Sequence, residues 1–216
     1  MIGMRARPKL APVDNYSQPK AVYHRGMDSS EADLAAFILA GGRSTRMGAD
    51  KAFVALEGRT LLARALDLAR SATHDVRIVG EAAKFAVFAP VVEDVFPGCG
   101  PLGGIHAALK ASQAELNLIL AVDMPFVPPA LLPFLLTRAR NSSAMVTVPR
   151  AFGGWQPLCG VYRRVFADVA ERALLAGGYK IDALFGEGRT HAVGEDELEA
   201  AGFSASVFRN LNTKEE

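Results

Sequence analysis

Two cations and one carboxylate are the residues of this sequence that could act on a phosphate group. Arg46 and Lys51 lie in a glycine-rich segment, and Asp123 follows an apolar stretch. An arginine can bind a phosphate with two parallel hydrogen bonds, whereas a lysine acts as a point charge. A carboxylate is a ligand that Mg²⁺ takes together with substrate phosphates. Arg46, Lys51 and Asp123 are therefore the predicted catalytic residues, and Asp123 is the predicted metal ligand.

The glycine-rich segment covers residues 39–51, with the sequence Leu-Ala-Gly-Gly-Arg-Ser-Thr-Arg-Met-Gly-Ala-Asp-Lys. Its glycines allow a sharp turn and a close approach to a ligand, and successive N–H groups of such a loop can form a nest for phosphate oxygens. A plain turn with solvated cations is the alternative. The position after a buried strand, with two cations, favours phosphate binding. The candidate nucleotide-binding residues here are Leu39, Ala40, Gly41, Gly42, Gly48 and Lys51.

A second glycine cluster, at residues 98–105, allows two interpretations. The segment reads Gly-Cys-Gly-Pro-Leu-Gly-Gly-Ile, and Gly98, Gly100 and Gly103 match the dinucleotide-binding fingerprint. Asp123 follows Gly103 by about the 20 residues that this fingerprint requires, which would make the chain an NAD(P)-dependent oxidoreductase. Pro101 within the tight turn argues against it, and the first loop would be left without a role. A Walker A loop is excluded, because Ala52 follows Lys51 where that motif needs serine or threonine.

Two aspartates follow predicted strands. Asp123 comes after an apolar run at residues 118–122 and stands before Met124 and Pro125. An aspartate in this place is often only a turn residue, but its carboxylate is also a ligand that Mg²⁺ takes together with substrate phosphates. Asp94 follows the short apolar pair Val91-Val92 and is by itself an ordinary residue at the end of a strand.

Residues 39–51 resemble the signature Leu-Ala-Gly-Gly-x-Ser-x-Arg-Met-Gly-x-Asp-Lys of the molybdenum cofactor guanylyltransferases. The resemblance extends from Ala35 to the end of the chain. That family joins GMP from GTP to molybdopterin in bacteria. The resemblance therefore implies GTP and molybdopterin as substrates, Mg²⁺ as the cofactor and pyrophosphate as the second product. It also makes molybdoenzyme maturation proteins candidate partners.

The resemblance assigns further residues to the nucleotide site. In the family, the segment that matches Gly100, Pro101, Leu102 and Gly103 closes this site, and together with the first loop it helps to distinguish guanine from cytosine. The cytidylyl relatives typically have Ala-Ala-Gly where this chain has Ala-Gly-Gly. Asp94 matches an aspartate that lines the GTP site.

The same resemblance covers the acceptor half of the chain. Residues 156–158, Gln-Pro-Leu, resemble a strand near the pterin side, and Asn210 and Asn212 match a closing Asn-x-Asn-Thr-Pro. Lys214 stands where the family has proline. Gly80 stands where the family often has an asparagine that contacts the nucleotide, so we expect this contact to be absent or supplied elsewhere.

The elements that must position these residues alternate between strand and helix patterns. We expect a single Rossmann-like α/β nucleotidyltransferase domain with a mainly parallel sheet and helices on both faces. Ligands then collect at the carboxyl ends of the strands. The predicted helices cover residues 60–71, 102–111 and 165–176, with a further one opened by Pro128-Pro129. The predicted strands cover residues 35–39, 76–79, 91–92, 118–122, 145–148, 157–162 and 206–208.

Residues 1–33 have little apolar periodicity, and we expect a flexible N-terminal tail before a domain at 34–216. Translation could start at Met27, and the tail would then be dispensable. The formal net charge of +1 offers no basic surface for nucleic acid. No apolar run reaches the ~20 residues of a membrane span. The two cysteines are expected to be free thiols, and the protein a cytoplasmic monomer.

Two other functions remain open on the sequence alone. One is the same chemistry with CTP or with a sugar-phosphate acceptor. The other is a carrier that binds GTP or the pterin without catalysis and hands the cofactor to an apoenzyme. The charged residues of the first loop favour an enzyme over a carrier.

Overall fold

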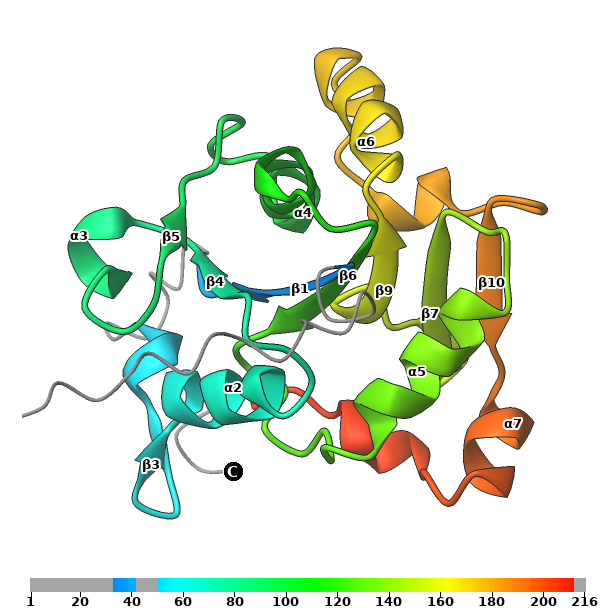
Figure 1. The fold of residues 1–216 in the computed structure, drawn as a ribbon, viewed down its shortest axis with the longest axis horizontal. Coiled ribbons are helices and arrows are strands. Elements are labelled where there is room, and N and C mark those ends of the chain that lie inside the picture. The colour runs from blue at the N-terminus through cyan, green and yellow to red at the C-terminus, as the bar shows by residue number, and fades with distance from the viewer. Residues whose placement is uncertain (1–32, 42–49, 212–216) are drawn as a thin grey trace, which may run out of the picture.

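The computed structural model describes residues 33–41 and 50–211. Its centre is an eight-stranded sheet in the order β10-β7-β9-β6-β1-β4-β5, with β8 paired to β7 (Figure 1). The predicted tail, with the boundary at residue 33, falls almost entirely outside this description. The strands of the sheet are β1 (Leu34–Leu39), β4 (Val76–Val79), β5 (Val91–Val92), β6 (Leu116–Ala121), β7 (Val146–Ala151), β8 (Gly154–Trp155), β9 (Cys159–Arg163) and β10 (Thr190–Val193), and β2 (Ala55–Leu56) with β3 (Arg59–Thr60) forms a separate hairpin.

The sheet is mainly parallel, as predicted. β1 pairs in parallel with β4 and β6, β4 with β5, and β7 with β10. β9 is the exception, because it runs antiparallel to both β6 and β7. Because β9 is antiparallel to both of its neighbours, β7 runs in the same direction as β6. The apolar sequence of β1, and of β6 apart from Asn117, follows from their burial on both faces.

Helices cover both faces of the sheet, also as predicted. On one face lie α4 (Pro101–Ala111) and α6 (Phe166–Leu175), and on the other lie α2 (Leu61–Arg70) and α5 (Leu131–Arg140) (Figure 1). Successive side chains of β1 divide between the two cores: Ile38 packs on the α2 and α5 side, and Phe37 on the α4 and α6 side. The short helical elements are α3 (Ala82–Phe85), α7 (Glu195–Ala200), η1 (Lys51–Phe53), η2 (Ile181–Leu184) and η3 (Ala205–Phe208).

Local chemistry explains where the central helices begin. α2 starts after Thr60, whose hydroxyl accepts a hydrogen bond from the Ala63 N–H at 3.2 Å and so caps the first turn. α4 starts at Pro101, which needs no N–H partner at the first helical position. The preceding Gly100 has φ = +70°, a conformation that glycine adopts without strain.

The C-terminal third shows where sequence patterns failed. The predicted strand at 206–208 is wrong: this segment is the 3₁₀ helix η3, which buries Phe208 at 3% exposure instead of pairing with the sheet. β10 and α7 are elements that the sequence pattern did not predict. β10 has a half-exposed pattern that becomes a strand because β7 offers it a parallel partner. The helix expected from Pro128 begins at Leu131, and the two prolines form the turn before it.

Candidate active site

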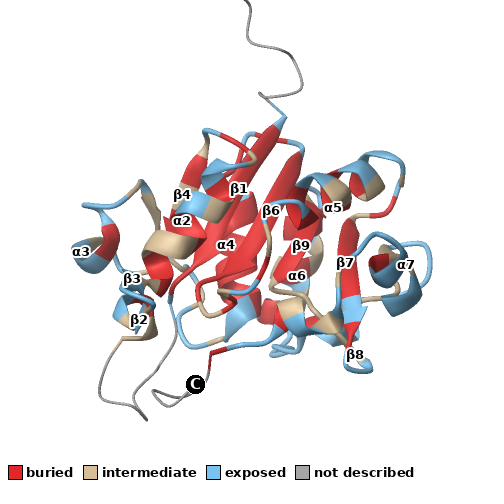
Figure 2. Cartoon of the chain, turned by 90° about the horizontal axis from the view of Figure 1, so that it is seen from below, coloured by how far each residue is buried: buried red, intermediate tan, exposed pale blue. Residues whose placement is uncertain are grey.

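The loops that carry the predicted site residues leave the sheet at one edge, here called the carboxyl edge. Since β1, β4, β5 and β6 are parallel, their carboxyl ends meet there (Figure 2). Ala40 follows β1, Gly80 follows β4, Asp94 lies just after β5, and Asp123 lies just after β6. Segments that are far apart in sequence therefore converge at this edge, as expected for an open α/β sheet.

Lys51 and Asp123 form an ion pair at the carboxyl edge. The Nζ atom of Lys51 lies 3.2 Å from Oδ2 of Asp123, and the two side chains are 23% and 21% exposed. Lys51 is the first residue of η1, which Asp50 caps by accepting a hydrogen bond from the Ala52 N–H. The carbonyl of Asp123 accepts one from the Leu211 N–H at 2.9 Å. The sequence identified both charged residues, but it did not show that they meet.

A partly exposed carboxylate beside an ammonium group suits a phosphate substrate with its metal ion. Across residues 33–41 and 50–211, no three acidic, histidine or cysteine side chains gather into a complete metal site. Mg²⁺ usually takes one or two carboxylates from the protein and the remaining ligands from phosphates and water. Asp123 alone therefore fits a Mg²⁺ ion that arrives with a nucleotide.

The first residues of the glycine-rich loop are bound into the sheet. The N–H groups of Ala40 and Gly41 both donate to the carbonyl of Val79, at 3.0 and 3.1 Å, and the carbonyl of Leu39 accepts from Val122 N–H. These groups hold the loop base between β4 and β6. The other predicted residues of this loop, Gly42, Arg46 and Gly48, lie outside the described residues.

Asp94 is locked against the start of α4. Its Oδ1 accepts a hydrogen bond from the Phe96 N–H at 2.8 Å. A Cβ atom added to Gly103 would lie 2.7 Å from Asp94 Oδ2, so only glycine permits this approach. Burial raises the pKa of the Asp94 carboxyl above its ordinary value, and the Phe96 N–H opposes the rise. Gly103 thus has a physical role that its place in a glycine motif did not reveal.

The rest of the second glycine cluster builds the helix start. Gly100 and Pro101 set the first turn of α4, whose N-terminus follows β5 at the carboxyl edge, where the helix dipole favours an anion. Leu102 is fully buried in the core on the α4 side, so its side chain holds the helix in place. Cys99 is a free thiol, as predicted.

The chain end reaches the same edge. The hydrogen bond from the Leu211 N–H to the Asp123 carbonyl places the backbone of exposed Asn210 next to the segment that carries Asp123. Asn212, its predicted partner, lies beyond the last described residue. The proximity of Asn210 to Asp123 depends on a contact across most of the domain, which no local pattern contains.

Residues 36–192 match the family described as MobA-like NTP transferase domain. The chain belongs to this family. It is similar to the molybdenum cofactor guanylyltransferase of Desulfosudis oleivorans, with 36% identity over 182 residues, which cover 83% of this chain and 90% of that protein. The probable molybdenum cofactor guanylyltransferase of Pelotomaculum thermopropionicum is 34% identical over 178 residues, with 82% and 86% covered. Among solved structures, molybdopterin-guanine dinucleotide biosynthesis protein A of Archaeoglobus fulgidus superposes with a TM-score of 0.72, at 28% identity and with 83% and 92% covered.

The dinucleotide-fingerprint alternative has no support in the MobA-like domain. Gly98, Gly100 and Gly103 follow β5, which is the outermost strand of the sheet. A dinucleotide fingerprint belongs at the strand where the sheet order reverses. Asp123, which would have bound a ribose, is paired with Lys51.

No helix in the described part of the domain is long and apolar enough to cross a membrane.

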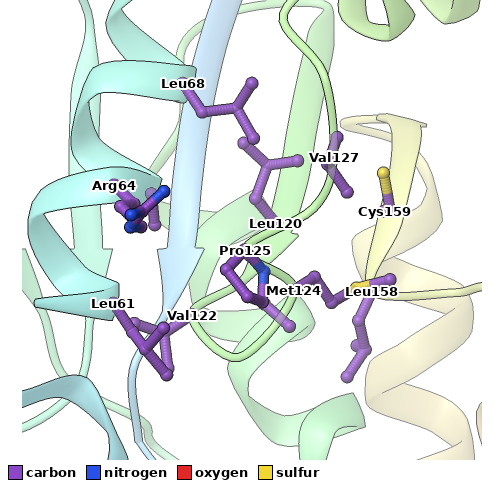
Figure 3. Close-up of a pocket in the computed structure, with 12 residues that line it drawn as sticks. Leu61, Arg64, Leu68, Leu120, Val122, Met124, Pro125, Val127, Leu158 and Cys159 are labelled. Carbon is purple, nitrogen blue, oxygen red and sulfur yellow. The ribbon is translucent and has the colours of Figure 1, made fainter. Parts of the chain in front are cut away.

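A pocket behind the carboxyl edge is separate from the ion pair (Figure 3). It lies between α2 and the turn after β6, and its lining is mostly apolar and includes Leu120, Val122 and Met124. Arg64 also lines it, but its guanidinium donates to the Leu56 carbonyl at 2.8 Å. Burial raises the pKa of the Cys159 thiol to about 12, so this lining residue is unreactive at neutral pH. Neither Lys51 nor Asp123 lines this pocket.

Two features near the site escaped the sequence analysis. Lys84 of α3 lies 3.6 Å from Asp50 Oδ2 and brings a further cation close to η1. Its local sequence looks like that of any solvated helix, so no signal could have identified it. A Cβ atom at Gly80 would meet the ring of Phe85 at 2.8 Å. The aromatic ring therefore occupies the place where a side chain at position 80 would begin.

His106 of α4 packs against Phe96, in the segment that follows Asp94. Its burial leads to a prediction of how stability depends on pH. It is 2% exposed, its ring packs edge-on against Phe96 at 5.1 Å, and neither ring nitrogen has a hydrogen-bond partner among the described residues. Burial lowers the pKa of His106; Glu171 at 3.8 Å, Asp94 and Asp168 act in the opposite direction, whereas Lys110 acts with burial.

We expect the free energy of unfolding to fall as the pH drops below the ordinary histidine value of about 6.5. In that range the unfolded chain binds a proton that the folded protein excludes, so stability rises with pH, by at most about 1.4 kcal/mol per unit. Urea unfolding at about pH 7.5 and pH 5.5 measures the difference, which His106→Leu should reduce. An unchanged difference in the variant would show that other groups cause the pH dependence.

Proposed function

We propose that this chain transfers GMP from GTP to molybdopterin, forming the guanine dinucleotide form of the molybdenum cofactor and releasing pyrophosphate. The observation that carries the proposal is the Lys51–Asp123 ion pair at the carboxyl edge of a MobA-like domain. The activity for which the relatives are named supports the substrate pair. A cation and a carboxylate at this edge are what a nucleoside triphosphate with its metal ion requires.

In the proposed reaction, a phosphate oxygen of the acceptor attacks the α-phosphorus of GTP in line. The new P–O bond forms as the bond to the β-phosphate oxygen breaks, and pyrophosphate takes the electron pair. No covalent enzyme intermediate is needed, because positioning and charge supply most of the catalysis in phosphoryl-group transfer.

The residues of this chain have distinct parts in that reaction. Lys51 exchanges its partner Asp123 for a phosphate oxygen and offsets the growing negative charge. Arg46 in the first loop binds the departing pyrophosphate, since a guanidinium can contact two of its oxygens at once. Asp123 is the residue that would hold Mg²⁺, which when bound draws charge from the phosphate oxygens.

Asp94 and the two glycine segments are proposed to select the base. The carboxylate of Asp94 can only accept hydrogen bonds, and guanine offers two adjacent donors, N1–H and the N2 amino group, that one carboxylate can bind together, whereas cytosine offers only its N4 amino group. Ala40 and Gly41 lie at the base of the first loop, and Gly100 opens α4 across the same edge. Gly80 has no side chain that could contact the base, so we assign the contact with the base to Asp94.

We expect the protein to bind GTP more tightly than CTP in the presence of Mg²⁺. Each polar contact to a base edge that CTP leaves unmade costs about 1–3 kcal/mol, or roughly 5- to 150-fold in affinity. Isothermal titration calorimetry with both nucleotides measures the ratio. Equal affinities, or tighter binding of CTP, would contradict guanine selection.

The experiment that tests the function itself is pyrophosphate release with each of the four nucleoside triphosphates, with and without molybdopterin. Release only with GTP and molybdopterin together is the expected result. Release with CTP, or with a sugar phosphate in place of molybdopterin, would identify a nucleotidyltransferase of the same reaction type with a different substrate. A carrier would bind GTP or the pterin but release no pyrophosphate with any pair.

A further inference from the structure

The two halves of the carboxyl edge carry different elements. On one side of Asp123 lie the ends of β1, β4 and β5 with the glycine segments proposed for the nucleotide. On the other side, the two reversals at β9 turn β7 so that it ends at this same edge. There the chain makes a tight hairpin from β7 to β8, here called the β7–β8 hairpin, residues 150–155 (Figure 2). An acceptor that attacks in line must approach from the side away from the leaving pyrophosphate.

The tip of the β7–β8 hairpin is strained in an unusual way. Ala151 pairs with Gly154, so the loop has only Phe152 and Gly153, with φ of +54° and +71°. Two positive φ values define the hairpin turn that asparagine followed by glycine favours. A phenylalanine in this conformation costs free energy. Its side chain is 64% exposed, so packing within the domain does not repay that cost.

The side chains beside the tip form an ordered aromatic and cationic surface. The Arg150 guanidinium lies over the Trp155 ring at 4.8 Å, and Trp155 packs edge-on against Phe185 at 5.1 Å. The Gly153 N–H donates to Glu195 of α7 at 3.3 Å, which holds the turn from outside. Within the described part of the chain, Arg150 forms no ion pair, and its guanidinium donates only to the Gly153 carbonyl.

The hairpin connects directly to the reacting centre. Residues 156–158 run from Trp155 into β9, and the carbonyl of Leu158 accepts a hydrogen bond from the Ala121 N–H at 2.8 Å. Leu158 therefore lies beside the end of β6, just before Asp123. A ligand placed along this segment would have one end at the aromatic tip and the other at the ion pair.

We propose that the β7–β8 hairpin binds the acceptor, with Phe152 and Trp155 contacting its flat heterocycle and Arg150 its anionic groups. This inference rests on the proposed function, which makes the acceptor a pterin that carries a phosphate. Aromatic side chains stack on flat heterocycles whatever substituents the ring carries. The acceptor phosphate then points along residues 156–158 toward Asp123.

The test uses the tryptophan at the proposed contact, because Trp155 is the single tryptophan of the chain. Molybdopterin should quench the protein fluorescence, whereas Mg²⁺-GTP alone should leave it unchanged. Phe152→Asn removes the ring but supplies the residue that the turn prefers, so the hairpin should form at least as well. We expect this variant to raise the molybdopterin Kd from quenching, and its KM in pyrophosphate release, by about tenfold. The KM for GTP should stay within about twofold of wild type.

A matched control removes another exposed apolar side chain from the opposite edge of the sheet. Val165 is 50% exposed at the start of α6, and Val165→Asn should leave both constants unchanged. If wild type is active and Phe152→Asn has the same Kd and KM for molybdopterin, the hairpin proposal alone is overturned. Absence of pyrophosphate release from wild type with any acceptor would overturn the proposed function. Quenching by GTP alone would place the nucleotide, not the acceptor, at the hairpin.

Discussion

Replacement of Asp123 by asparagine is expected to slow pyrophosphate release by about 10²–10³-fold at saturating Mg²⁺-GTP and molybdopterin. Asparagine keeps the size of the side chain but removes its charge, so Lys51 loses its ion pair with Asp123 and the metal ion loses its carboxylate ligand. Folding should survive. The side chain is 21% exposed, and its backbone carbonyl still accepts the Leu211 hydrogen bond. The free energy of unfolding should therefore change by no more than about 1 kcal/mol.

Asp168→Asn is the matched control for this prediction. Asp168 also pairs with a lysine at 3.2 Å, but it lies on α6 with an exposed side chain, away from the carboxyl edge. Its removal should leave the rate unchanged. If folded Asp123→Asn releases pyrophosphate within a factor of about three of wild type, Asp123 is not the metal ligand and the proposed mechanism is wrong.

Replacement of Lys51 by methionine is expected to lower kcat/KM for GTP by about 10²-fold. The apolar stem is largely kept, but the charge that would stabilise the phosphates in the transition state is lost. Lys110→Met is the control, because Lys110 pairs with Asp168 and Glu171 on the α4 and α6 side. Steady-state rates of pyrophosphate release, with calorimetry of GTP binding, separate an effect on turnover from one on ground-state affinity.

The double variant Lys51→Met/Asp123→Asn tests whether the two groups act together. If both serve the same phosphates, the combined loss should be smaller than the product of the two single losses. A combined loss equal to that product would mean that the ion pair has no part in a shared step. Urea unfolding of all three variants should show nearly wild-type stability, because a partly exposed pair adds little.

Much of the fold could be predicted because its determinants are local. The buried runs of β1 and β6 are apolar on both faces, which only a covered parallel sheet explains. The pattern of α2 is amphipathic, and Thr60 marks its start. The segment at 206–208 could not be assigned correctly in this way, because its three apolar or small residues fit a strand and a helical turn equally well. Only the core that receives Phe208 decides between them.

By itself, the sequence determined the central strands and helices, the family and the kinds of side chain that the site contains. Lys51 and Asp123 could be named from their motifs, because a motif records residue types at short spacing. Their 3.2 Å contact, the docking of Leu211 on Asp123 and the arrival of the β7–β8 hairpin at the same edge were decided by the tertiary structure. Each depends on strand order and on the reversed direction of β9. These arise from packing between segments far apart in the chain, so no short stretch of sequence contains them.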